Sequence, residues 1–339
     1  MTDRYDIAVV GATGAVGTIM LKLLEERGFP VGKLRPLASA RSEGRKVVFA
    51  GREVKVRELT AGSFDGVDIA LFSAGGARSR EFGPTAAEAG AVVIDNSSAF
   101  RMEPNVPLVV PEVNPDDVKW HEGIIANPNC STIQMVVPLK AIHDAVGIER
   151  VVVTTMQSVS GTGNRAIEEL FSQSEAVLES GEVQVGVYPH RIAFNIIPHI
   201  ESFHDSGYTN EEVKMVQETR KILGAPDLRL TATCTRVPVF NTHCESLNVQ
   251  TAGPLSAAAA RELLAATPGI VVEDDPAAGA YPMPITAQGR DEVFVGRIRE
   301  DESAENCLNL WIVSDNLRKG AATNAIQIAE LLVREGMAG

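Results

Sequence analysis

The sequence has no apolar run that approaches the roughly 18 residues needed to span a bilayer, so it predicts no transmembrane helix. Residues 1–6 lead directly into a strand-like segment and lack the layout of a signal peptide. Its four cysteines, Cys130, Cys234, Cys244 and Cys307, include no pair with CxxC spacing. They are too few for a disulfide framework in a chain of this size, and no metal site is predicted. These absences indicate a reducing, cytoplasmic setting.

Basic residues are not in excess either. The chain has 31 Lys and Arg against 44 Asp and Glu, a formal net charge of −13 and a pI near 5.0. This net negative charge does not predict a nucleic-acid-binding surface, although a local Arg/Lys cluster can still bind a small anionic substrate. Repeats and low-complexity segments are also absent. With 339 residues, 45% hydrophobic and 22% charged, the sequence predicts a globular protein of about two domains.

The N-terminal segment has the layout of a dinucleotide-binding unit. Residues 6–10 form an apolar run typical of a buried strand, and apolar residues then recur at helical spacing until Gly28. Between them stand Gly11, Gly14 and Gly17. In a binding loop these glycines would allow a tight turn, close approach to a pyrophosphate and close packing of the helix on the sheet. The spacing is GxxGxxG rather than the commoner GxGxxG, so a merely tight turn is the alternative.

The next predicted strand, around residues 34–38, ends in a segment that favours NADP. NAD enzymes usually place a carboxylate here to hold the ribose hydroxyls, but this sequence has none before Glu43. It has Arg41 and Ser42 instead, and an arginine can grip the 2′-phosphate of NADP with two hydrogen bonds. The alternative is that Arg41 is an ordinary solvated loop charge.

Two further strands, at residues 68–72 and 91–95, flank a helix predicted at 78–89. This alternation of strands and helices predicts a parallel, doubly wound sheet. Loops that follow the carboxyl ends of such strands line the ligand crevice. Arg101 lies in one of these loops and is a candidate anion clamp.

Cys130 stands in the segment 127–132, which carries an Asn-Pro turn signal and precedes an apolar helical pattern. The start of a helix presents unpaired N–H groups and partial positive charge, which favour a thiolate. Cys130 is therefore a candidate nucleophile, and the alternative is one more small buried residue. The helix is predicted to extend to about Ala145, with Pro138 expected to kink or interrupt it. A domain boundary is expected near Cys130.

The second half of the chain mixes strands, helices and a second glycine-rich turn. A capping pattern at Thr209 opens a charged helix that carries Lys214. The final helix is expected to return to the first domain. The remaining expectations are a strand at 149–157, a glycine-rich turn at 158–163, a helix at 164–179, irregular structure at 181–207, strands at 228–239 and 243–251, a helix at 256–266, a strand at 307–313 and a helix at 320–334.

With these motifs the chain resembles the aspartate-semialdehyde dehydrogenase family, and the likeness runs in order through essentially the whole sequence. The segments that carry it are Gly11–Gly17, Ser97–Arg101, Asn129–Thr132, Gln157–Gly161, Arg236–Val239 and Asp315–Ala321. The resemblance implies an α/β fold with a Rossmann-type NADP-binding domain at residues 1–130, completed by 314–339. An α+β catalytic and dimerisation domain would span 131–313.

The resemblance also implies an activity. The family reduces 4-phospho-L-aspartate with NADPH to L-aspartate 4-semialdehyde, releasing phosphate, in the biosynthesis of lysine and diaminopimelate, methionine and threonine. The reaction proceeds through a cysteine thioester, a step that suits a thiolate because it can both attack and leave. The family works as a homodimer, with no nucleic-acid or membrane partner.

Residue roles follow from the same resemblance. Cys130 matches the nucleophile, Gln157 the residue that orients the acyl group, and His243 the acid/base, a role suited to a group that titrates near neutrality. Substrate and phosphate contacts are implied for Arg101, Asn129, Glu211, Lys214 and Arg236. Cofactor contacts are implied for Thr13, Gly14, Ala15, Val16, Arg41, Ser42, Ser160, Gly161 and Asn316.

Other interpretations remain open for the sequence alone. His243 could be an ordinary core or surface histidine, and Glu211 with Lys214 an ordinary solvated helix pair. An N-acetyl-gamma-glutamyl-phosphate reductase would share the architecture and the thioester chemistry. A catalytically inactive Rossmann protein could serve as a binding or regulatory subunit. The presence of Cys130, Gln157, Arg236 and His243 together argues against that last alternative.

Overall fold

The computed structural model describes residues 4–338 and divides into two compact units. The first comprises Met1–Asn129 with Ala321–Gly339, and the second comprises Cys130–Gly320. Residues 314–320, which the resemblance assigns to the first domain, thus cluster with the second unit. Within the described part of the chain, no helix is both long and apolar enough to cross a membrane.

The first unit is built on a six-stranded sheet in the order β5-β2-β1-β6-β7-β8, and every pair of neighbours in it is parallel. Strands that follow β1 in the chain are added first on one side of it (β2, β5) and then on the other (β6, β7, β8), so the strand order switches between β1 and β6. A small antiparallel β3–β4 hairpin forms a separate two-stranded sheet. The strands are β1 Tyr5–Val10, β2 Val31–Ala38, β3 Lys46–Phe49, β4 Arg52–Lys55, β5 Arg57–Glu58, β6 Ile69–Phe72, β7 Val92–Asp95 and β8 Ile124–Ala126.

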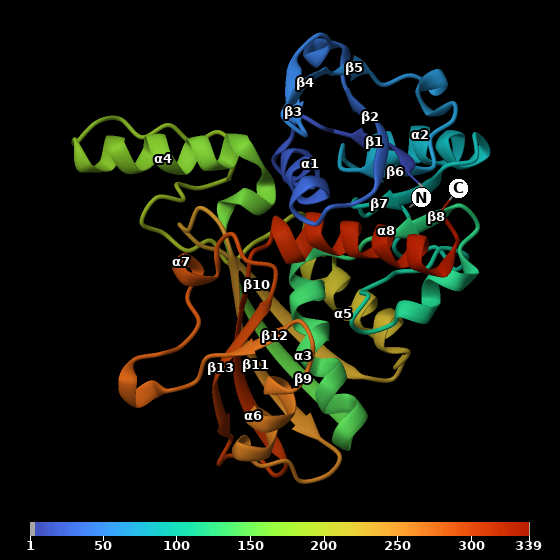
Figure 1. The fold of residues 1–339 in the computed structure, drawn as a ribbon. Coiled ribbons are helices and arrows are strands. Elements are labelled where there is room, and N and C mark those ends of the chain that lie inside the picture. Colours follow the sequence, from blue (N-terminus) through green and yellow to red (C-terminus); the bar gives the residue numbers. More distant parts are fainter. Residues whose placement is uncertain (1–3, 339) are drawn as a thin grey trace. The chain divides into compact units, whose positions relative to one another are not determined.

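Helices cover both faces of this sheet, which explains why its strands read as continuous apolar runs. On one face α1 (Ala15–Glu26) packs beside the last helix, α8 (Thr323–Glu335), and both share a core with inward residues of β1 and β6 (Figure 1). On the other face α2 (Gly76–Glu88) packs over residues such as Phe72 and Val93. The predicted return of the last helix to the first domain and the predicted parallel doubly wound sheet are both confirmed.

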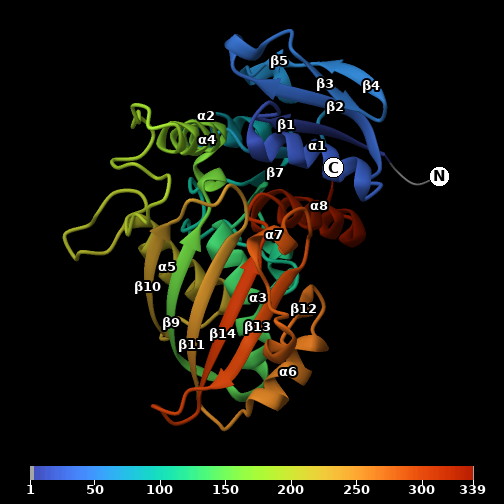
Figure 2. The ribbon, with the colours of Figure 1, turned by 90° about the vertical axis from the view of Figure 1, so that its left-hand side faces the viewer.

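The second unit carries a mixed six-stranded sheet in the order β10-β9-β11-β14-β13-β12, visible as a row in Figure 2. The β10–β9 and β13–β12 pairs are parallel, and the pairs between them are antiparallel. Its strands are β9 Ile148–Gln157, β10 Arg229–Arg236, β11 His243–Thr251, β12 Ile270–Val272, β13 Val293–Glu300 and β14 Cys307–Ser314. Its helices are α3 Cys130–Val146, α4 Asn164–Leu178, α5 Asn210–Leu223, α6 Ala257–Ala265 and the short α7 Pro284–Ala287.

Helix α3 packs against β9, β11 and β14 and also contacts α5 and α6. It begins at Cys130 and continues without a break through Pro138, so the expected interruption there is wrong. Proline does remove one intrahelical hydrogen bond. However, every residue from Ser131 to Leu139 is buried, and this packing offsets the loss.

Helix α5 starts as the capping pattern predicts. The Thr209 hydroxyl accepts from the Glu212 N–H at 3.4 Å, and the Glu212 carboxylate accepts from the Thr209 N–H at 2.7 Å. The second oxygen of Glu212 accepts from the Cys234 N–H of β10 at 2.9 Å. The cap therefore also fixes α5 to the sheet. Residues 181–207 form neither helix nor strand, as expected.

Candidate active site

Three of the predicted site residues lie at one end of the second unit's sheet. Gln157 is the last residue of β9 and Arg236 the last of β10, and the two are paired in parallel register. His243 is the first residue of β11, which runs antiparallel to β9, and it pairs with Ser314, the last residue of β14. Because β11 runs in the opposite direction, its start meets the ends of its neighbours. Adjacent strands thus carry all three residues at the same end of the sheet.

Cys130 differs from the other three cysteines in its surroundings. It is partly exposed at the first residue of α3, where the helix presents its positive end, whereas Cys234, Cys244 and Cys307 are buried. Burial raises the pKa of Cys244 to about 12 and raises that of Cys234 further, so both remain thiols. These three cysteines are small buried residues, as most free cysteines are. Cys130 is the cysteine placed to act as a nucleophile.

Gly320 packs directly against Cys130. A Cβ built on Gly320 would lie 2.9 Å from the Cβ and 3.3 Å from the Cα of Cys130. Both atoms are held by backbone, so rotation of a side chain could not relieve the contact. The missing side chain at position 320 therefore leaves room for the first turn of α3 to hold Cys130 where it is.

His243 is fully buried, and its ring orientation is set by the backbone. Its Nδ1 accepts a hydrogen bond from the Ser158 N–H at 3.1 Å, which places the proton of the neutral ring on Nε2. Burial, followed by the charge of Arg236, holds the pKa of His243 well below its usual range. The shift moves the pKa of His243 away from the near-neutral range that suits an acid/base histidine. The ring is a neutral Nε2–H donor, and that atom has no hydrogen-bond partner among the described residues.

Arg236 is a buried guanidinium, 5% exposed, that has no ion pair with a carboxylate among residues 4–338. Its Nη1 donates to the Ser158 carbonyl at 2.7 Å, and its Nε has no hydrogen-bond partner in the described part of the chain. The ring of Tyr188 lies 5.9 Å from its Cζ. A buried positive charge without a protein counter-ion is costly unless an anion pairs with it. This environment suits a group that binds the carboxylate of a ligand.

Gln157 belongs to a chain of buried polar groups that leads away from the strand end. Its Nε2 donates to Glu211 Oε1 at 3.0 Å and to Thr155 Oγ1 at 3.3 Å. Lys214 then pairs with Glu211 at 3.3 Å and with Glu201 at 2.5 Å. Glu211 is 3% exposed, so the interpretation of an ordinary solvated helix pair is wrong. Their ion pair, three residues apart on α5, shows that Glu211 and Lys214 share one face of this helix.

The second glycine-rich turn, Val159–Thr162, joins this cluster. The Asn316 Oδ1 accepts from the hydroxyls of Ser158 at 3.1 Å and Ser160 at 3.2 Å, and from the Thr242 N–H at 2.8 Å. Gly161 is exposed, and a Cβ there would lie 3.0 Å from Arg236 Nη1 and 3.3 Å from His243 Nε2. The absence of a side chain at Gly161 thus leaves both polar atoms uncrowded.

In the first unit, the glycine loop stands where the sheet order reverses, between β1 and β6. A Cβ on Gly11 would lie 2.3 Å from the Ser73 carbonyl oxygen, and one on Gly17 would lie 2.1 Å from that of Gly11. Thr13, Gly14, Ala15 and Val16 are partly exposed at the start of α1. That helix has no side-chain cap and no acidic residue in its first turn. Its free N–H groups suit a phosphate.

Arg41 and Ser42 form a short 3-10 turn directly after β2. Arg41 is exposed and makes no ion pair among the described residues, whereas Ser42 is 6% exposed. The carboxyl end of β2 is where a Rossmann unit holds the adenosine ribose. The position of Arg41 therefore suits a 2′-phosphate, while Ser42 offers little surface to a ligand.

Arg101 and Asn129 also lie in the first unit. Arg101 is 7% exposed and donates to the backbone carbonyls of Asn127 at 2.9 Å and Asn96 at 3.2 Å. These carbonyls follow β8 and β7, so Arg101 is fixed at the carboxyl edge of the parallel sheet. Asn129, also 7% exposed, is bonded in sequence to Cys130.

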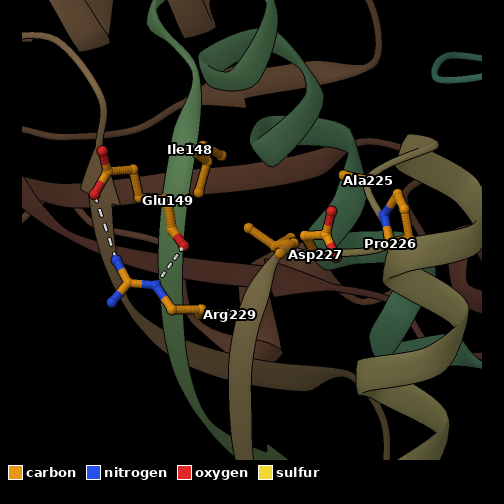
Figure 3. Close-up of a pocket in the computed structure, with 7 residues that line it drawn as sticks. Ile148, Glu149, Ala225, Pro226, Asp227 and Arg229 are labelled. Carbon is orange, nitrogen blue, oxygen red and sulfur yellow. Dashed lines mark hydrogen bonds and ion pairs between the residues drawn. The ribbon is translucent and has the colours of Figure 1, made fainter.

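A hollow in the second unit contains none of these residues. It is lined at the opposite end of the sheet, where β9 and β10 begin, and Arg229 there bonds the carbonyl and side chain of Glu149, both at 3.3 Å (Figure 3). Gln157 and Arg236 stand at the far ends of the same two strands. The hollow is therefore separate from the candidate active site.

Residues 6–121 match the semialdehyde dehydrogenase NAD binding domain, and residues 139–319 match the semialdehyde dehydrogenase dimerisation domain. The chain is 58% identical over 337 residues to the aspartate-semialdehyde dehydrogenase of Aquifex aeolicus, which covers 98% of this chain and 99% of that protein. The chain belongs to the aspartate-semialdehyde dehydrogenase family. Neither an N-acetyl-gamma-glutamyl-phosphate reductase nor an inactive regulatory subunit is favoured by these relatives.

Solved structures in the aspartate-semialdehyde dehydrogenase family agree with this fold. Aspartate semialdehyde dehydrogenase II of Vibrio cholerae, complexed with ASA, superposes with a TM-score of 0.96 at 50% identity and covers 98% of this chain and 99% of that one. The enzyme of Candida albicans, crystallised with NADP, gives a TM-score of 0.79 at 26% identity, covering 99% and 100% of the two chains. The predicted fold class, a Rossmann-type domain plus a mixed-sheet domain, is confirmed.

Relative to the family resemblance, the structure adds three residues that sequence reasoning missed. Ser158 contacts both His243 and Arg236 through its backbone, Gly320 packs on Cys130, and Tyr188 covers the Arg236 guanidinium. Ser158 and Gly320 lie inside two of the segments that carry the family resemblance, and this location could have marked them as candidate site residues. Tyr188 lies in the irregular segment, where the sequence shows no pattern.

Proposed function

We propose that this chain is an NADP-dependent phosphorylating aldehyde dehydrogenase that interconverts 4-phospho-L-aspartate and L-aspartate 4-semialdehyde. The observation that carries the assignment is the buried Arg236, which has no carboxylate partner among residues 4–338 and lies with Gln157 and His243 at one end of the second unit's sheet. A substrate with a carboxylate, an amine and an acyl group matches the charges offered there. The full-length similarity to named aspartate-semialdehyde dehydrogenases supports the same substrate.

In the proposed reaction the Cys130 thiolate attacks the acyl carbon of 4-phospho-L-aspartate. A carbon–sulfur bond forms and the bond from the acyl carbon to the phosphate oxygen breaks, so phosphate leaves with the electron pair. NADPH, when bound, supplies the hydride that reduces the thioester. The carbon–sulfur bond then breaks, the Cys130 thiolate is regenerated and the aldehyde is released.

The other residues of the second unit would bind and polarise the substrate. The neutral His243 donates its Nε2–H to the acyl oxygen as negative charge develops on it. Arg236 pairs with the α-carboxylate, and Glu211 accepts from the α-amine. Gln157, held by Glu211, orients the acyl group. Fixed donors of this kind cost little reorganisation during the reaction.

The remaining predicted residues would hold phosphate and cofactor. Arg101, Lys214 and Asn129 are assigned to the phosphate group. The start of α1 at residues 13–16 would bind the pyrophosphate and Arg41 the 2′-phosphate, with Ser42 contributing its backbone. Ser160, Gly161 and Asn316 are assigned to the nicotinamide end. The uncapped helix and the unpaired Arg41 fit the cofactor that the Candida albicans relative binds.

We further propose that two copies associate through the face of the second sheet that α3 and α5 leave uncovered. Thr233, Thr154, Ser246 and Trp311 form one row across four strands, and all are exposed or partly exposed. None is charged, as suits a buried interface. The match to a dimerisation domain supports this assignment. Thr154→Arg should convert a dimer to a monomer in sedimentation velocity, and an unchanged sedimentation coefficient would refute the proposed face.

The deciding experiment for the activity is a phosphate-dependent assay. L-Aspartate 4-semialdehyde, NADP and phosphate are combined, and reduced cofactor is followed with each component omitted in turn. We expect turnover only with all three, and its loss in Cys130→Ala. Cys307→Ala, which changes a buried cysteine on β14, is the matched control and should retain activity. Turnover with N-acetylglutamate semialdehyde but not aspartate semialdehyde would overturn the assignment.

A further inference from the structure

Tyr188 stands in the long irregular segment between α4 and α5, yet its position is closely determined. The segment is tied to α4, because the Glu169 carboxylate accepts from the N–H groups of Gly186 at 3.2 Å and Val187 at 2.5 Å. The Gln173 amide oxygen accepts from the Ile192 N–H at 2.9 Å on the other side of Tyr188. Tyr188 is therefore presented by a braced loop rather than by a loose one.

The loop also has an apolar core of its own. Val159, Leu170 and Ile192 are buried together, and Val187 and Tyr188 pack against them. This small core joins the irregular segment to α4 and to the second glycine-rich turn. Packing against this core holds the Tyr188 side chain in place.

From this position Tyr188 contacts two parts of the candidate site. Its ring lies over the Arg236 guanidinium, with 5.9 Å from Cζ to the ring centroid, and its hydroxyl donates to Thr162 Oγ1 at 3.0 Å. Thr162 ends the turn that holds Ser160 and Gly161. Burial raises the pKa of Tyr188, so its hydroxyl remains protonated as a donor.

Arg236 needs such a neighbour. Within residues 4–338 its guanidinium makes one hydrogen bond, from Nη1 to the Ser158 carbonyl at 2.7 Å, and its Nε has no hydrogen-bond partner. A guanidinium fixed at one nitrogen can still swing, and the loss of orientation weakens binding to a planar carboxylate. An aromatic face restricts that motion and stabilises the charge.

We propose that Tyr188 is a positioning residue for substrate recognition. It holds the Arg236 guanidinium in the orientation that receives the substrate carboxylate, and it links this guanidinium to the turn that ends at Thr162. The inference rests on the proposed role of Arg236 as the carboxylate clamp. It makes the irregular segment part of the specificity apparatus. Tyr188 acts through Arg236 and touches no reacting atom.

The test separates the ring from the hydroxyl and measures recognition of the carboxylate. Full-length wild type, Tyr188→Leu, Tyr188→Phe, Arg236→Leu and the double variant with both leucines are compared. Each is assayed with aspartate 4-semialdehyde and with 3-aminopropanal, which keeps the amine and aldehyde but lacks the carboxylate. The readout is the ratio of the two kcat/KM values, together with the KM for phosphate and for NADP.

We expect Tyr188→Leu to lower the ratio by about two- to thirtyfold, the range of a cation–π contact, with the KM for phosphate and NADP unchanged. Tyr188→Phe keeps the ring and should keep most of the ratio. In the double variant the ratio should equal that of Arg236→Leu, because Tyr188 has nothing left to position. Tyr208→Leu is the matched control. The Tyr208 hydroxyl forms a 2.8 Å hydrogen bond with Thr231 Oγ1 and not with Arg236.

Two failures are distinguishable. If Arg236→Leu keeps the wild-type ratio, Arg236 is not the carboxylate clamp and the proposed function loses its main support. If Arg236→Leu lowers the ratio of the two kcat/KM values while Tyr188→Leu leaves it unchanged, the positioning role of Tyr188 is refuted. The same holds if the two decreases multiply in the double variant. In both cases the role of Arg236 as the carboxylate clamp is retained. A fall in thermal stability without a change in the ratio also refutes the positioning role, because it shows packing only.

Discussion

Replacing Gly320 with alanine tests whether the space beside Cys130 matters for catalysis. The new Cβ would lie 2.9 Å from the Cβ of Cys130, whereas ordinary contact begins at 3.4 Å, so the two must separate by about 0.5 Å. The backbone at 320 does not require a left-handed conformation, so crowding is the main perturbation. Overpacking of this kind costs about 1–3 kcal/mol of stability. The chain should therefore remain folded while its nucleophile moves.

The expected kinetic effect follows from that displacement. A misplacement of about 1 Å can cost a reaction on the order of a hundredfold, so a shift half as large should lower kcat by roughly tenfold. The assay is the phosphate-dependent oxidation of aspartate 4-semialdehyde, combined with the rate at which iodoacetamide alkylates Cys130. The alkylation rate reports the nucleophile itself, independently of cofactor and substrate binding.

The matched control is Gly253→Ala in the same unit. Gly253 also has no left-handed conformation, and a Cβ there would meet its nearest neighbour at 4.0 Å. Its kcat and alkylation rate should equal those of the wild type. If Gly320→Ala retained the wild-type kcat and alkylation rate, the reasoning that Gly320 places Cys130 would be refuted.

Three further predictions follow from single side chains. Arg41→Ala should weaken NADP by about ten- to a hundredfold but NAD little, and equal losses in their KM values would contradict the 2′-phosphate assignment. Because burial holds the pKa of His243 below 6.5, the unfolded imidazole takes up a proton that the folded one does not. Stability should thus fall as the pH drops below about 6.5, and less so in His243→Asn, as denaturant unfolding at several pH values would reveal. Burial raises the pKa of Glu245, so the folded carboxyl keeps a proton that the unfolded one loses above 4.5. Folding stability is then lost as the pH rises above 4.5. Glu245→Gln removes this loss and should raise the melting temperature at neutral pH. A melting temperature below that of the wild type would show that the buried Glu245 carboxyl is charged.

Much of the fold was readable from local patterns. The apolar run before Gly11 and the helical spacing after Gly17 define a strand, turn and helix, because those patterns depend on neighbours in sequence. The capping box at Thr209 is equally local and was predicted correctly. The break that was expected at Pro138 as one of two outcomes does not occur, for the opposite reason. The effect of this proline on α3 depends on the burial of the surrounding turn, which is a tertiary property.

The site shows the same division. Motif likeness along the chain was enough to name Cys130, Gln157, Arg236 and His243 as candidates. It could not show that β11 lies between β9 and β14, which brings the start of one strand to the ends of others. Nor could it show the protonation of His243, because the depressed pKa comes from full burial beside Arg236.

By itself the sequence determined the Rossmann-type layout and the family and singled out Cys130 as the candidate nucleophile, since these rest on residue order and spacing. Only the tertiary structure decided that Gly320 makes room for Cys130, that the Ser158 N–H selects the His243 tautomer, and that Tyr188 covers Arg236. The physical reason is that close packing, burial and hydrogen-bond direction arise between segments far apart in the chain. Such contacts leave no periodic mark on the sequence of either segment.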